Sequence, residues 1–255
     1  MTMRIGAQLY TVRDFCKTAG DLARTCQRIA AMGYEGVQVS AIGPIEPKEV
    51  RRILDDHGLV CAATHKSLDA LRDTAKVIEE HQILGCSLTA LGAFHGPDEA
   101  EWREFAQTFN QIGKTLAAQG LRVGYHNHSH ELAPLGEPRL GVLTPLRLLL
   151  DELDPSIWFE IDTYWIAHGG GDPATWIEAC RGRIPSVHFK DMTITPERQQ
   201  KMCEVGSGNL NWPRIFQACR DVGVQWCLVE RDHGDLDPFQ SLEVSLRNLQ
   251  QMGLK

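Results

Sequence analysis

The chain has 255 residues, of which 43% are hydrophobic, and its formal net charge is −7. Charges of both signs are spread along the sequence without a basic block, which argues against nucleic acid as a partner. No stretch approaches the roughly 20 apolar residues of a membrane span, and no secretory signal is recognisable, so we expect a cytoplasmic protein with no membrane partner. The eight cysteines form no C-x-x-C pair, which is typical of reduced, buried thiols.

Strand-like and helix-like segments alternate eight times along the chain. Short apolar runs predict strands at residues 3–10, 36–41, 60–67, 87–92, 122–128, 157–164, 184–191 and 226–232. Helices are predicted at residues 21–32, 46–57, 68–84, 97–119, 144–153, 173–181, 212–222 and 238–252. The fourth helix has the clearest pattern, because large apolar residues recur at helical spacing from Trp102 to Leu116.

Eight strand–helix units in about 250 residues are the number and size of a (β/α)8 TIM barrel, and we expect one such domain over residues 1–255. A doubly wound open sheet is the competing fold, but it usually carries a glycine-rich turn after its first strand, where this chain reads LYTVR. The longer connections at 129–142, 166–172 and 192–211 follow strand ends on the face that carries active sites in barrels. We expect them to cover a substrate.

Ionisable residues stand at or just beyond the ends of the last four predicted strands. They are Glu131, Asp162, His188 and Glu230. Each one alone has a plainer explanation, such as a core histidine, a capping aspartate or a carboxylate in a surface ion pair. The carboxyl ends of neighbouring parallel strands converge, however, and a divalent metal removes the cost of burying such groups together. The sequence therefore predicts a metal site.

The residues around this group fit a metal-dependent reaction at a carbonyl, such as that of a sugar. His126 and His128 are two apart and share one face of the fifth strand, and Lys190 shares a face with His188. An oxygen-rich site with one or two imidazoles suits Mn²⁺, with Mg²⁺, Co²⁺ and Zn²⁺ as alternatives. Such an ion polarises a carbonyl and acidifies the neighbouring C–H, and a carboxylate beside it can move the proton.

Seven motifs, taken in order, resemble the sugar phosphate isomerase/epimerase family, the xylose isomerase-like TIM barrels that are also grouped with AP endonuclease family 2. The motifs are GAQLYTVRD (6–14), GYEGVQVS (33–40), GYHNHSHEL (124–132), FEIDTYWIAHGGGDP (159–173), VHFKDM (187–192), EVGSGNLNW (204–212) and VERD (229–232). They cover essentially the whole chain. They are specific for fold and metal site but weak for substrate, because the family includes isomerases, epimerases, inosose dehydratases and enzymes that act on keto-glycosides.

The resemblance implies a set of metal ligands. The family uses Glu, Asp, His and Glu from strands five to eight, and Asp162, His188 and Glu230 match the last three. Glu131 matches the first through the Y-H-N-H-x-x-E pattern at 125–131, whereas a strict position at the strand end would favour His126. In the family's epimerases the first and last glutamates also carry protons, which here implies Glu131 and Glu230.

Further residues complete the expected site. Lys190 and His65 are expected to hold substrate hydroxyls or a developing oxyanion. Expected substrate contacts are Gln8, Gln38, His126, His128, Trp165 and Arg231.

The expected function is a metal-dependent sugar isomerase or epimerase that acts on a small sugar or sugar derivative, with a homo-oligomeric state left open. Glu230 would remove a proton beside the carbonyl to give an enediolate, and Glu131 would return it. The Y-H-N-H motif differs from that of typical ketose epimerases, so a lyase or dehydratase acting on a keto-sugar or keto-glycoside is the alternative. An endonuclease-like phosphodiesterase would need a basic rim, and an inactive sugar-binding module would have lost ligands. Neither feature is found.

Overall fold

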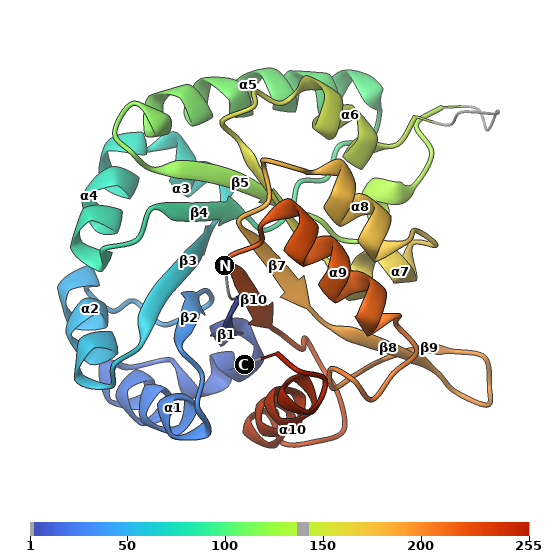
Figure 1. Ribbon diagram of the computed structural model, residues 1–255. Coiled ribbons are helices and arrows are strands. Elements are labelled where there is room, and N and C mark those ends of the chain that lie inside the picture. Colours follow the sequence, from blue (N-terminus) through green and yellow to red (C-terminus); the bar gives the residue numbers. More distant parts are fainter. Residues whose placement is uncertain (1–2, 137–142, 255) are drawn as a thin grey trace.

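The computed structural model describes residues 3–136 and 143–254, and within them eight parallel strands close into a barrel (Figure 1). The barrel strands are β1 (Arg4–Gln8), β2 (Gly36–Val39), β3 (Val60–Lys66), β4 (Leu88–Leu91), β5 (Arg122–His126), β6 (Trp158–Asp162), β7 (Ser186–Phe189) and β10 (Trp226–Val229). β1 pairs with both β2 and β10, so the sheet has no free edge. The predicted TIM barrel is confirmed, and the open sheet is excluded.

Helices surround this barrel on the outside (Figure 1). They are η1 (Leu9–Phe15), α1 (Ala19–Met32), α2 (Pro47–Asp56), α3 (Leu68–Arg72), α4 (Thr74–Leu84), α5 (Glu99–Ala117), η2 (His130–Leu132), α6 (Pro145–Glu152), α7 (Thr163–His168), α8 (Pro173–Ala179), α9 (Trp212–Val222) and α10 (Pro238–Gln251). In α5 the apolar residues at helical spacing are buried, as the pattern predicts, and Asp98 caps the helix by accepting from the Glu101 N–H at 3.0 Å.

The structure differs from the predicted helices at two places, and at each an aspartate caps the start of a helix that was not predicted. The predicted helix at 68–84 is broken into α3 and α4 at Asp73, whose side chain accepts from the Lys76 N–H at 3.2 Å. No helix was predicted between the strand at 157–164 and the helix at 173–181, yet one follows Asp162. Its side chain accepts from the Trp165 N–H and starts α7.

The long connection at 192–211 contains structure that the sequence pattern did not reveal. An antiparallel hairpin of β8 (Asp191–Ile194) and β9 (Gln200–Cys203) extends from the barrel (Figure 1). Of the other two long connections, the one at 129–142 lies partly outside the described residues, and the one at 166–172 begins within α7.

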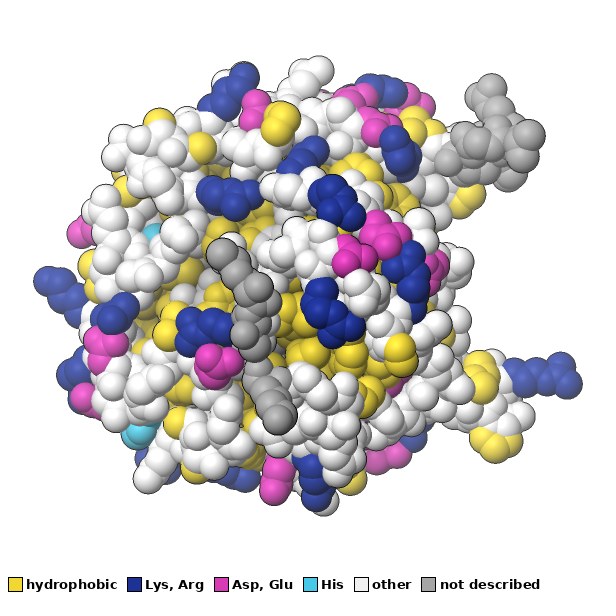
Figure 2. Space-filling view, in the orientation of Figure 1, with side chains coloured by type: hydrophobic (Ala, Val, Ile, Leu, Met, Phe, Trp, Pro, Cys, Tyr) yellow, Lys and Arg dark blue, Asp and Glu magenta, His cyan; other side chains and the backbone are white. Residues whose placement is uncertain are grey.

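Charged side chains of both signs are interspersed on the face seen in Figure 2, without a large field of one sign. Among the helices that the structure describes, none combines the length and apolar character that crossing a bilayer requires.

Candidate metal and substrate site

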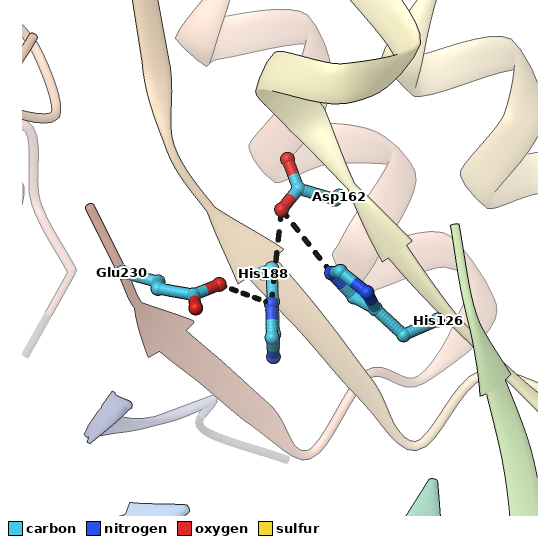
Figure 3. A group of neighbouring side chains, drawn as sticks. All are labelled: His126, Asp162, His188 and Glu230. Carbon is cyan, nitrogen blue, oxygen red and sulfur yellow. Dashed lines mark hydrogen bonds and ion pairs between the residues drawn. The ribbon is translucent and has the colours of Figure 1, made fainter. Parts of the chain in front are cut away.

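Four neighbouring barrel strands deliver one side chain each to a common point (Figure 3). His126 and Asp162 end β5 and β6, His188 lies in β7, and Glu230 directly follows β10. All four are buried, and one potential ligand atom from each lies within 4.8 Å of the others. The convergence follows from the parallel register, since Asp162 pairs with His188 across β6 and β7.

The structure does not bring Glu131 into this group. β5 ends at His126, and the chain then turns into η2, where the Glu131 carboxylate accepts from the Tyr125 hydroxyl and the His128 N–H, both at 2.8 Å. Glu131 thereby holds the loop after β5, in a separate cluster with His128 and His130. His126, the alternative first ligand, stands in the group instead.

Backbone contacts orient His126 and Asp162. His126 Nδ1 lies 3.0 Å from the Gly92 carbonyl oxygen, which can only accept, so Nδ1 carries the hydrogen and Nε2 faces Asp162 Oδ2 at 3.3 Å. Asn127 Oδ1 accepts from the Asp162 N–H at 3.0 Å. Asp162 Oδ1 accepts from Trp165, so Oδ2 is the oxygen that faces the group.

A chain of buried amides orients His188. Gln38 Nε2 donates to both oxygens of Glu160, at 2.9 and 3.0 Å, so Gln38 Oε1 is the atom that receives His188 Nε2 at 2.6 Å. Gln8 Nε2 donates to the same Oε1. His188 Nδ1 therefore faces Asp162 and Glu230. Gln8 and Gln38, expected as substrate contacts, are fully buried and support the imidazole from behind.

Glu160 is a functional candidate that the sequence analysis missed. Its carboxylate accepts from Ser186 Oγ at 3.0 Å, contacts His65 Nε2 at 2.6 Å and lies 3.2 Å from His188 Nε2. Burial alone would raise the pKa of Glu160, but His188 and His65 outweigh it and lower that pKa well below its usual range. The sequence could have indicated Glu160, because it stands two residues before Asp162 and therefore lies on the same face of the strand.

Lys190 brings a positive charge to the site. Its Nζ lies 3.0 Å from Asp162 Oδ2, 2.8 Å from Glu230 Oε2 and 3.2 Å from the Asp232 carboxylate. It shares the face of His188, as the two-residue spacing predicts. Burial alone would lower the pKa of Lys190, but the negative charges of Asp162 and Glu230 outweigh burial and raise that pKa. Asp232 was also missed, although it stands two residues after Glu230.

The chemistry of these side chains fits a divalent cation. His188 Nδ1 faces Glu230 Oε2 at 2.8 Å in the buried centre of the group, and the Lys190 ammonium is the other partner of that oxygen. The outer nitrogens of His126 and His188 are engaged by Gly92 and Gln38, which leaves the inner nitrogens to face the carboxylates. Two imidazoles and two carboxylates are a donor set for Mn²⁺, Co²⁺ or Zn²⁺.

A cavity of about 680 Å³ opens beside the four candidate ligands, and His65, His128, Trp165, Lys190 and Glu230 are among its lining residues. Within the described part of the chain, His128 Nδ1 and Trp165 Nε1 have no hydrogen-bond partner. Burial, aided by His126 and Lys190, lowers the pKa of His128 to about 2, so this ring is neutral near pH 7. The wall thus combines aromatic surface with unused polar atoms, as sugar sites do.

Arg231, the last expected substrate contact, is not among the residues that line this cavity. Neighbouring residues at the end of a strand face opposite sides, and Glu230 takes the inner side. The Arg231 guanidinium donates to Glu204 Oε1 at 2.7 Å and to the Leu236 carbonyl oxygen at 2.6 Å. It ties the loop after β10 to the segment after β9.

The fold and this group of side chains define a TIM barrel with a candidate cation site where its strands end. A sequence model of the xylose isomerase-like TIM barrels matches residues 26–252, and the chain belongs to that family. The resemblance found in the sequence is confirmed.

Curated relatives match most of the chain at low identity. The chain is 24% identical over 259 residues to an inosose dehydratase of Klebsiella pneumoniae strain 342, with 83% of both chains covered. It is 25% identical over 229 residues to an inosose dehydratase of Mesomycoplasma hyopneumoniae strain 7448, with 80% of this chain and 72% of the relative covered.

Solved structures are similar over the whole chain. A sugar phosphate isomerase/epimerase from Parabacteroides distasonis superposes with a TM-score of 0.83 at 24% identity, covering 100% of this chain and 96% of that one. A D-allulose 3-epimerase from Methylomonas sp. superposes with a TM-score of 0.72 at 16% identity, covering 98% of both chains. At these identities the superpositions show the shared fold.

Proposed function

We propose that this protein is a metal-dependent enzyme that transfers a proton next to the carbonyl of a sugar or sugar derivative, as an isomerase or epimerase. The observation that carries the proposal is the buried group of His126, Asp162, His188 and Glu230 beside a polar cavity. The names of the similar proteins support it, because epimerisation beside a carbonyl and dehydration of a keto-sugar share a first step, the removal of that proton.

We assign the metal ligands to His126, Asp162, His188 and Glu230, with His126 in place of Glu131. Glu131 has both carboxylate oxygens occupied by the Tyr125 hydroxyl and the His128 N–H. When bound, a divalent ion, with Mn²⁺ expected and Mg²⁺, Co²⁺ or Zn²⁺ as alternatives, supplies Lewis acidity to the substrate carbonyl.

Glu230 is the proposed base. It lines the cavity, and although burial would raise the pKa of its carboxylate, Lys190 and His188 lower it well below the usual range. The ionised form that accepts a proton is therefore present at neutral pH. The Lys190 ammonium beside it is placed to stabilise negative charge that develops on a substrate oxygen.

His65 is proposed to orient the substrate. It lines the cavity while its Nε2 donates to Glu160 at 2.6 Å, which leaves Nδ1 as an acceptor for a substrate hydroxyl. Glu230, which carries the proton after the first step, is the proposed group that returns it. Glu131 was expected in this role, but it is not among the residues that line the cavity.

A dehydratase or lyase is the second candidate. It is favoured by the inosose dehydratases of Klebsiella and Mesomycoplasma, which match most of the chain. The same base would remove the same proton, and the two reactions differ afterwards. In an epimerase or isomerase the proton returns to carbon. In a dehydratase the hydroxyl group on the next carbon takes up a proton and leaves as water.

The test is a screen of ketoses, inososes and keto-glycosides with metal-loaded enzyme in D₂O, read by NMR after the metal is removed. Deuterium should enter at the carbon beside the carbonyl. Glu230→Gln should abolish this exchange, whereas Glu178→Gln, which alters a surface ion pair with Arg214, should retain it. Metal content is measured on each variant, because Glu230 is also a proposed ligand.

The products distinguish the two candidates. Exchange with an isomeric product supports the isomerase or epimerase, and exchange with loss of water or of a substituent supports the dehydratase or lyase. Turnover without exchange at carbon contradicts both and indicates hydrolysis or hydride transfer.

A further inference from the structure

A second cavity of about 410 Å³ adjoins the first. This side cavity lies beyond the ends of β2 and β3, between α2 and α4, and the two cavities share Ser40, His65 and Lys66 as lining residues. The shared residues therefore place the side cavity directly beside the larger one.

The walls of the side cavity combine polar and apolar surface in about equal parts. The apolar part is formed mainly by Ile42, Pro44, Ile45, Pro47, Val50 and Leu84, and Ser40 and Thr64 contribute to the polar part. Its charged residues are two lysines and two glutamates, Lys66, Lys76, Glu46 and Glu80, so their formal charges cancel. Lys66 is already paired with Glu80. This lining favours an uncharged group over a phosphate.

The loop that forms one wall is held in a fixed shape. The Gly43 N–H donates to the Cys16 carbonyl oxygen at 2.8 Å, and a Cβ on Gly43 would lie 1.9 Å from the Lys17 carbonyl oxygen. Ala41, which also lines the cavity, has a φ of 54°, a left-handed conformation that costs a non-glycine residue energy. A strained residue in a firmly packed loop indicates a preformed wall.

We propose that the side cavity is a subsite for an uncharged apolar group, of the size of a phenyl ring, that is attached to the sugar. This inference rests on the proposed function, because the sugar itself occupies the larger cavity. The enzyme then acts on a substituted sugar, and the substituent selects the substrate. Both cavities fall within the roughly 300–1,000 Å³ of typical ligand pockets.

A direct test uses phenol alone as the probe, with inorganic phosphate in a parallel titration. NMR of ¹⁵N-labelled protein should show saturable shifts with phenol at the amides of residues 42–45 and 66, and none there with phosphate. Ile45→Trp, which fills the side cavity, should weaken phenol binding at least tenfold. Val60→Trp, at a 40% exposed position at the start of β3, should bind phenol as the wild type does.

Other outcomes overturn the proposal. Absent phenol shifts, or shifts confined to other residues, contradict an apolar subsite, and phosphate shifts at Lys66 and Lys76 indicate an anion site instead. A loss of dispersed amide signals in Ile45→Trp would report misfolding, in which case Ile42→Trp is titrated in its place.

A second measurement links the subsite to catalysis. For a sugar that the screen turns over, the phenyl derivative should exceed the methyl derivative at least tenfold in kcat/KM, and Ile45→Trp should remove that preference. Equal values in the wild type contradict the subsite. If no sugar is turned over, the proposed function fails, while the phenol titration still decides whether the side cavity binds apolar groups.

Discussion

Three of the four side chains at the candidate metal site are held from behind by another group. The Gly92 carbonyl oxygen receives His126 Nδ1, and Gln38 receives His188 Nε2. The capping of α7 fixes the Asp162 carboxylate. Such contacts keep the inner atoms aimed at one point, which is the property that a preorganised metal site requires.

Glu160 is the residue at which this support can be tested. Glu160→Gln keeps the size of the side chain but presents an amide NH₂ to the donors of Gln38 and Ser186, and it weakens the hold on His188. Outer-shell changes of this kind typically cost about 10–100-fold in metal affinity or activity. Calorimetric titration of the metal-free protein with Mn²⁺ should show a loss of that size. Glu178→Gln should show no loss of Mn²⁺ affinity. A wild-type affinity in Glu160→Gln would show that Glu160 does not support the metal site.

The sequence predicted three of the four residues in the candidate metal group and left the first one open between Glu131 and His126. Asp162, His188 and Glu230 were found because each follows a clear apolar run. The choice between Glu131 and His126 depended on where β5 stops and how the chain turns afterwards, which its pairing with β4 and β6 decides. Glu160 could have been found, because the two-residue period places it beside Asp162.

At the scale of elements, one carboxylate organises the long connection between β7 and α9. Asp191 is fully buried. Its oxygens accept from the N–H groups of Met192, Gly206, Gly208 and Leu210 and from Trp212 Nε1 at 2.7 to 3.3 Å. It therefore anchors both ends of the segment that contains the β8–β9 hairpin.

Asp191→Asn should destabilise the protein, because an amide NH₂ would meet buried N–H donors and leave some of them without an acceptor. Each unsatisfied buried group costs about 1–3 kcal/mol, so we expect a loss of about 3 kcal/mol in the free energy of unfolding. Urea unfolding followed by circular dichroism measures it. Asp235→Asn, which alters an exposed pair with Lys201, is the control and should change stability by less than about 1 kcal/mol. Equal midpoints for the two variants would contradict the anchoring role.

The two helix starts that the sequence missed share a cause. Asp73 and Asp162 start helices by capping, and a cap is easily mistaken for a turn residue or a ligand when it follows a strong pattern. Asp162 caps α7 with one carboxylate oxygen and presents the other toward the candidate site. The hairpin at 191–203 lies in a polar stretch whose pairing depends on contacts such as those of Asp191.

At the scale of the whole molecule, the barrel was predictable because each of the eight units carries its own periodic signal. Closure then places the ends of β5, β6, β7 and β10 side by side, although the residues involved span more than 100 positions. The side cavity was not predictable, because it depends on the backbone of the loop after β2 and on how α2 and α4 pack.

A metal bound only by the folded state should stabilise the whole barrel. At a metal concentration 100 times Kd the gain is about 2.7 kcal/mol, which for a chain of this size corresponds to a rise in Tm of about 5–10 °C. Differential scanning calorimetry of the metal-free protein with and without Mn²⁺ measures this shift. Asp162→Asn is the matched control, since asparagine retains the cap of α7 but removes a charged ligand. Its Tm should be nearly independent of Mn²⁺, and an equal rise in both proteins would show that the ion binds elsewhere.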